Sequence, residues 1–179
     1  MRLFDYFGRL RRRDRGQSLA EFALVAPIFF LLVFGVIQIG LVMASQNGLV
    51  DGVRNAARRA ATYRVNEGSF DATVFSSICQ TIKDQLEDEL SKRVIGFTPA
   101  NLTHTVTYEW EPNAQTGDYF LVAHVNAVYA NQLYVPLISA FLDRSDGVTD
   151  DKLTLTASEQ MRIENPALDT PASLTAQGC

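Results

Sequence analysis

The chain carries no charged side chain between Glu21 and Asp51. Within this gap, Phe22 to Met43 reads FALVAPIFFLLVFGVIQIGLVM, and Gln38 is its only strongly polar side chain. A helix needs about 20 apolar residues to cross a hydrocarbon core of about 30 Å, and this segment has that length. It also lacks the polar stripe that a helix at the surface of a soluble domain shows. We therefore predict a membrane-spanning helix over this segment.

Charge is distributed unevenly on the two sides of the predicted span. Residues 1–16 contain six arginines and two aspartates, a net charge of +4, whereas the remainder carries ten Lys and Arg against eighteen Asp and Glu, a net charge of −8. The positive-inside rule places the basic leader in the cytoplasm and the acidic body on the other side of the membrane. An acidic body has no electrostatic attraction to nucleic acid, so we expect no nucleic-acid partner.

Three fates of the N-terminus are open from the residues alone. Signal peptidase could cut after Ala44, although the apolar stretch is longer than the 7–15 residues of an ordinary signal peptide. The helix could instead remain as an uncleaved anchor. A third interpretation is cleavage after Gly16, where glycine weakens the helix by about 1 kcal/mol relative to alanine and presents no side chain to a protease. The leader arginines would hold this site at the anionic inner surface of the membrane.

The residues around Gly16 resemble a known processing site. The sequence Gly16-Gln17-Ser18-Leu19-Ala20-Glu21-Phe22 resembles the prepilin peptidase site of Flp-type pilins, in which a glycine is followed by four residues, a glutamate and an aromatic residue. Residues 23–27, 55–61 and 160–165 are similar to the TadE-like family of minor pilins. The resemblance is specific over residues 14–62, and the related TadF group shares the same N-terminal architecture.

The resemblance implies a role for each residue of the motif. Gly16 is the last leader residue, Gln17 bears the new α-amine, Glu21 is the acid of the mature N-terminus, and Phe22 is the aromatic residue after it. The chain departs from type IV major pilins at Gln17, where an apolar residue is often found, and it is far longer than the Flp major pilin. Both departures favour a minor pilin over the filament subunit.

The family also implies partners and a location. These partners are the prepilin peptidase, other pilins, the pilus assembly platform proteins and the inner membrane. The location is a bacterial inner membrane, crossed once, with the C-terminal domain in the periplasm or displayed on a pilus. The position within a pilus (tip, base or membrane pool) and the adhesion target stay open.

Glu21 has three interpretations. A carboxylate at the centre of a bilayer costs about 2.5–3.5 kcal/mol, and a nearby cation lowers that cost. The α-amine of Gln17 would lie one helical turn away after cleavage, so Glu21 could pair with it in the same chain. Glu21 could also pair with the amine of a neighbouring subunit. In the third interpretation it marks the interfacial end of the helix, where a carboxylate suits the positive helix dipole.

The remaining sequence predicts an α+β protein with a pilin-like plan. Its parts are a cytoplasmic leader at 1–16, a long helix at 17–64, a periplasmic domain at 65–165 and a polar C-terminal tail at 166–179. Low hydrophobicity and two prolines indicate disorder in the tail.

Within the periplasmic domain, the apolar residues Val74, Ile78, Ile82, Leu86 and Leu90 recur every four positions and predict a second amphipathic helix that ends near Gly96. Residues 103–110 and 119–129 alternate around a turn at 113–118 and predict a β-hairpin, and residues 152–157 predict a third strand. Leu133 to Leu142 is ambiguous between a short helix and an apolar loop.

No arrangement of residues indicates an enzyme, a cofactor or a small-molecule substrate. His104 and His124 lie on the two strands of the hairpin and could face each other, but no closely spaced ligand pair supports a zinc site with Cys79. We expect no metal. Cys79 and Cys179 both lie on the predicted oxidising side of the membrane, where a disulfide between them is plausible.

The sequence therefore predicts a minor pilin of a Flp-type (tight adherence) type IV pilus system, which acts in pilus assembly and surface adhesion. The alternative is an uncleaved, membrane-anchored periplasmic accessory or adhesion domain that enters no filament. A soluble protein released after Ala44 and a metal-dependent enzyme rank below both.

Overall fold

A computed structural model describes the backbone of residues 4–62, 72–117, 119–135, 138–139, 142, 150–163 and 177–178. Within these ranges, the side chains of residues 4–16, 72–75, 77 and 177–178 are not described. The predicted α+β class is confirmed: the chain has a long apolar N-terminal helix, a second helix and an antiparallel sheet.

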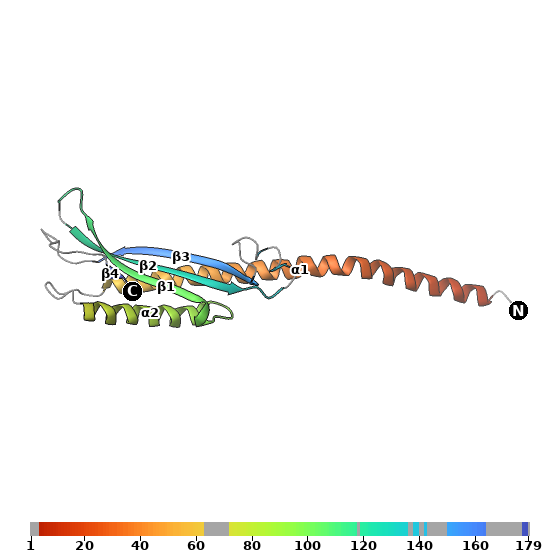
Figure 1. Cartoon of the computed structure of the whole chain (residues 1–179). Coiled ribbons are helices and arrows are strands. Elements are labelled where there is room, and N and C mark those ends of the chain that lie inside the picture. The colour runs from red at the N-terminus through yellow and green to blue at the C-terminus, as the bar shows by residue number, and fades with distance from the viewer. Residues whose placement is uncertain are drawn as a thin grey trace.

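The first helix, α1 (Phe4–Thr62), is continuous over 59 residues. At a rise of 1.5 Å per residue it is about 88 Å long. Its N-terminal half projects alone, and its C-terminal half lies along the sheet (Figure 1). Pro27 lies inside the helix without ending it, as prolines in membrane helices often do. The projecting part of α1, up to Phe34, is called the stalk below. The rest of α1 packs with α2 and the sheet, and these elements together are called the head.

The second helix, α2 (Ala72–Arg93), confirms the prediction made from the four-residue spacing. Ile78, Ile82, Leu86 and Leu90 are all buried. The helix ends three residues before Gly96, whose φ of +70° lies in the left-handed region that favours glycine. The spacing therefore predicted the buried face correctly and the helix end to within a few residues.

The sheet has the strand order β3-β2-β1-β4 and is antiparallel throughout. Its strands are β1 (Leu102–Pro112), which follows a short 3₁₀ helix at Pro99–Asn101, β2 (Tyr119–Gln132), β3 (Lys152–Arg162) and β4 (Gln177–Gly178). The hairpin between β1 and β2 and the third strand were predicted. Strand β4 was not, because two residues in the polar tail carry no periodic pattern; the rest of the tail lies outside the described residues.

Both helices pack on one face of the sheet. The core consists of the inward side chains of the strands and one face of each helix, with α1 against β2 and β3 and α2 against α1 and β1 (Figure 1). Val106 and Tyr108 of β1 point into this core, and Trp110 packs against it, as their alternation predicted. The opposite face of the sheet is covered by no other described element, and it carries a mixture of polar, charged and apolar side chains.

Candidate processing and assembly site

The predicted processing site lies within the free part of α1. The helix passes through Gly16 and Gln17 without interruption. Nε2 of Gln17 donates a hydrogen bond to Oε1 of Glu21 at 3.1 Å, and both side chains are exposed. The structure thus brings together position 17 and Glu21, one turn apart on the same side of the helix.

Glu21 stands at the start of a long apolar surface. The large apolar side chains of α1 from Leu19 to Phe34 are exposed, including Phe22, which is 67% exposed. Phe22 follows Glu21 directly and so points to a different side of the helix. In the part of the chain that the structure describes, α1 is the one helix long and apolar enough to cross a membrane. Exposed apolar surface of this extent requires lipid or other apolar helices around it.

Gln38 is the one strongly polar residue of the predicted span, and the head covers it. Its side chain has no exposed area. Oε1 of Gln38 accepts a hydrogen bond from the backbone nitrogen of Tyr134 at 2.9 Å. This contact was not predictable from local sequence patterns, because the two residues are 96 positions apart. The head therefore reaches down α1 into the segment that was predicted to span the membrane.

A row of small residues on α1 lies in the core, and its two glycines face α2. These residues are buried and recur every four positions: Gly48, Gly52, Ala56 and Ala60. Residues at this spacing lie on one face of a helix, so the row makes a flat strip along α1. A methyl group placed on Gly52 would lie 2.9 Å from Cδ2 of Leu90, which shows how closely α2 approaches. Sequence analysis missed this strip, although its four-residue repeat could have revealed it.

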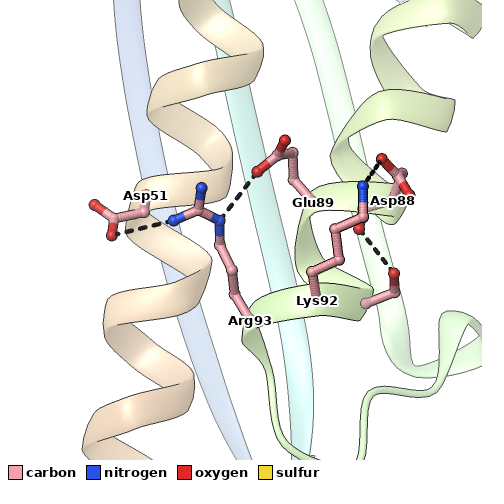
Figure 2. A network of polar contacts seen from close by, with 6 residues as sticks. Asp51, Asp88, Glu89, Lys92 and Arg93 are labelled. Carbon is pink, nitrogen blue, oxygen red and sulfur yellow. Dashed lines mark hydrogen bonds and ion pairs between the residues drawn. The ribbon is translucent and has the colours of Figure 1, made fainter.

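Charged side chains flank this helix contact at the C-terminal end of α2. Nε of Arg93 donates to Oε2 of Glu89 at 3.0 Å, and Nη1 lies 3.7 Å from Oδ2 of Asp51 on α1. Figure 2 shows the Arg93 side chain between the two carboxylates, with an ion pair between Lys92 and Asp88 beside it. Ion pairs exposed to solvent contribute little to stability. They orient the end of α2, whereas the apolar contact along the small-residue row holds the two helices together.

Cys79 is disulfide-bonded and buried on the inner face of α2. Its sulfur lies 3.9 Å from the carbonyl oxygen of Val106 on β1. Gly178 pairs with Thr107, the next residue along β1, so strand β4 lies beside the part of β1 that Cys79 contacts. The predicted partner, Cys179, lies outside the described residues, and the Cys79–Cys179 pairing stays a prediction.

Removing this disulfide is expected to destabilise the head. A bridge between Cys79 and Cys179 closes a loop of about 100 residues, and loss of such a bridge typically costs about 2–4 kcal/mol. Cys179→Ser should lower the free energy of unfolding by that amount, measured by urea titration of the full chain in detergent with Trp110 fluorescence. Reductant should shift the wild type to the same midpoint and leave the variant unchanged. Alkylation of both wild-type cysteines without reduction would contradict the pairing.

The two histidines do not face each other, so that prediction was wrong. His104 pairs with the buried Ala127 on the helix-covered face, whereas His124 pairs with Thr107 on the opposite face. Burial, with a smaller effect of the Lys83 charge, lowers the pKa of His104 below its ordinary value. Among the described residues, no group of three His, Cys, Asp or Glu side chains could hold a metal ion.

Comparison with known proteins gives one family match, and it lies in the N-terminal helix. No curated protein and no solved structure matches the chain. The family model described as TadE-like protein matches residues 16–58. The match begins at Gly16 and ends within α1, so it covers the motif, the apolar stalk and most of the small-residue row. The resemblance that the sequence suggested is confirmed over this segment, and the chain is TadE-like in its N-terminal helix.

Proposed function

We propose that the chain is a minor pilin of a Flp-type (tight adherence) pilus. It is made as a prepilin with a cytoplasmic leader, cut between Gly16 and Gln17 by a prepilin peptidase, and held in the inner membrane by α1 until it joins other pilins through the assembly platform. Its role is structural, with no catalytic site, cofactor or small-molecule substrate. The TadE-like match, which begins at Gly16 itself, supports this proposal.

The observation that carries the proposal is the placement of position 17 relative to Glu21. The hydrogen bond between Gln17 and Glu21 places the two residues on one side of the helix, at the edge of the exposed apolar surface. Cleavage before Gln17 would create an α-amine within one turn of the carboxylate. That amine could neutralise Glu21 of its own chain or of a neighbouring subunit, which would lower the cost of placing either charge among packed apolar helices.

Cleavage is expected to depend on the glycine at position 16. The helix is continuous there, so a peptidase must unwind it before it can reach the scissile bond. Leucine favours the helix by about 1 kcal/mol relative to glycine and adds a side chain next to that bond. When the full chain is produced together with its prepilin peptidase, we expect the wild type to begin at Gln17 and Gly16→Leu to remain full length, as measured by intact mass and N-terminal sequencing.

Gly8→Leu is the matched control, because Gly8 lies in the same leader and the same helix. It should be cut as the wild type is. If wild-type chains from their own membranes keep the leader, the processing claim fails and an uncleaved anchored domain outside any filament explains the data better. A wild-type N-terminus just after Ala44 would instead indicate a released soluble protein.

A further inference from the structure

An apolar segment of the head lies against α1 at the level of the predicted span. From Leu133 to Leu142 the sequence reads LYVPLISAFL, without a charge. Of its described residues, Tyr134 donates its backbone N–H to Gln38. Ile138 lies beside Gly35, where an added methyl group would be 3.4 Å from its Cδ1. The segment therefore contacts α1 at Gly35 and Gln38, which both precede Met43, the last residue of the expected span.

Simple geometry places these contacts inside a bilayer. Gln38 follows Glu21 by 17 positions and Gly35 follows it by 14, which correspond to about 26 Å and 21 Å along the helix. A hydrocarbon core is about 30 Å thick. If the core begins at Glu21, both contacts lie within it. The part of α1 from Phe22 to Phe34, which lies before these contacts, is only about 20 Å long and would not cross the core alone.

The surface of α1 at this depth has the composition that lipid requires. Val36, Ile39 and Met43 point away from the head and are at least half exposed. Gln38, the one strongly polar side chain among them, is completely covered by the head. In water the exposure of a glutamine would cost nothing, whereas in hydrocarbon it is unfavourable. The apolar surface of the stalk thus continues without a polar break past the point where the head begins.

Polar groups of two described residues of the segment, Ser139 and Leu133, are paired within the protein. The buried hydroxyl of Ser139 donates to Oδ1 of Asp151 at 2.8 Å, and the backbone nitrogen of Leu133 donates to the carbonyl oxygen of Asp151 at 2.9 Å. Tyr134 is 52% exposed, and its ring extends from the Gln38 level to Gly96, since a methyl group there would collide with the hydroxyl. An exposed tyrosine between an apolar and a polar zone is typical of membrane interfaces.

We propose that the described residues Leu133–Val135, Ile138 and Ser139 of this segment lie in the outer leaflet of the bilayer that α1 spans, with Tyr134 at the level of the headgroups. The head is then attached to lipid at two places, along α1 and through this segment. The partner is the lipid bilayer, because the segment lies against α1 where the exposed apolar surface of that helix continues. This inference rests on the membrane span that the proposed function includes.

Depth-dependent fluorescence quenching tests the proposal. Trp110 is the only tryptophan of the chain and lies toward the far end of β1. In a Trp110→Phe background, Tyr134→Trp, Ile138→Trp and Phe30→Trp each place one tryptophan at a chosen depth. The full-length chains are reconstituted into phosphatidylethanolamine and phosphatidylglycerol vesicles whose acyl chains are brominated at shallow or deep positions. Far-ultraviolet circular dichroism confirms that each variant is folded.

The expected result is strong quenching at position 134 by shallow bromines, strong quenching at 138 by deeper ones, and no quenching of Trp110 in the wild type. Position 30 should be quenched by deep bromines. If position 30 is quenched while 134 and 138 respond only to aqueous acrylamide, the head stands clear of the bilayer and the proposal is wrong. If position 30 is not quenched either, the membrane span itself is wrong, and the proposed function fails with it.

Discussion

We expect Glu21→Ala to abolish incorporation of the chain into pili and to leave its processing and membrane insertion intact. After cleavage the new α-amine of Gln17 needs an anionic partner among apolar helices, and Glu21 is the only carboxylate between Gln17 and Asp51. A single charge costs about 2.5–3.5 kcal/mol at the centre of a bilayer and less near its edge, where Glu21 lies in the proposed arrangement. Without Glu21 this cost recurs for each subunit that enters a packed bundle. Immunoblots of sheared pili and of the membrane fraction measure the effect.

Two further variants separate charge pairing from other effects. Glu21→Gln keeps the shape and removes the charge, so it should fail as Glu21→Ala does. Gln17→Ala removes the observed side-chain hydrogen bond and keeps the α-amine, so it should assemble normally. Glu109→Ala, the same change at an exposed site on β1, is the matched control and should also assemble. Normal amounts of the Glu21→Ala chain in sheared pili would show that Glu21 only marks the interfacial end of the helix.

Local patterns in the sequence were sufficient to predict both helices and the strands β1, β2 and β3. The four-residue spacing of Ile78, Ile82, Leu86 and Leu90 identified α2 because each residue falls on the same buried face. Alternation identified the hairpin, with Val106 and Tyr108 inside. These patterns are local, and tertiary contacts reinforce them. The fold class followed from them directly.

Contacts between distant segments were not predictable in the same way. The hydrogen bond from Tyr134 to Gln38 depends on where the chain turns after β2, and nothing near either residue encodes that path. Strand β4 is two residues long and is defined only by its pairing with Thr107 and Tyr108. The histidines were placed on the correct strands, but their faces depend on the register, which pairs His104 with Ala127.

The candidate site likewise has one part that could be predicted from a local pattern and another part that only the structure shows. The motif from Gly16 to Phe22 is contiguous, so its resemblance could be seen in the sequence alone, and the TadE-like match over residues 16–58 includes it; its role in processing stays a prediction. The structure adds that the side chains of Gln17 and Glu21 meet. It also shows that the predicted span has two parts. The large apolar side chains up to Phe34 are exposed, whereas the part from Gly35 onward is flanked by the head.

A large loss of stability is expected from filling the contact between α1 and α2. At Gly52 an added Cβ would lie 2.9 Å from Cδ2 and 3.4 Å from Cγ of Leu90, and 3.6 Å from Cδ1 of Leu86. Both leucines are fully buried, so Gly52→Leu must push the helices apart. Overpacking of this kind costs about 1–3 kcal/mol or more. Urea unfolding of the full chain in detergent, monitored by Trp110 fluorescence, should show this loss in the free energy of unfolding.

Gly40→Leu is the matched control, because nothing lies within 4 Å of a Cβ placed there. It gains about 1 kcal/mol of helix propensity and should not destabilise the head. Leu90→Ala alone should cost about 2–5 kcal/mol through the cavity that it leaves. In Gly52→Leu/Leu90→Ala the new side chain occupies that cavity, so the double variant should lose less than the sum of the single losses. Additive losses would mean that Gly52 and Leu90 do not share one packing site, and that the small-residue row does not set the distance between the helices.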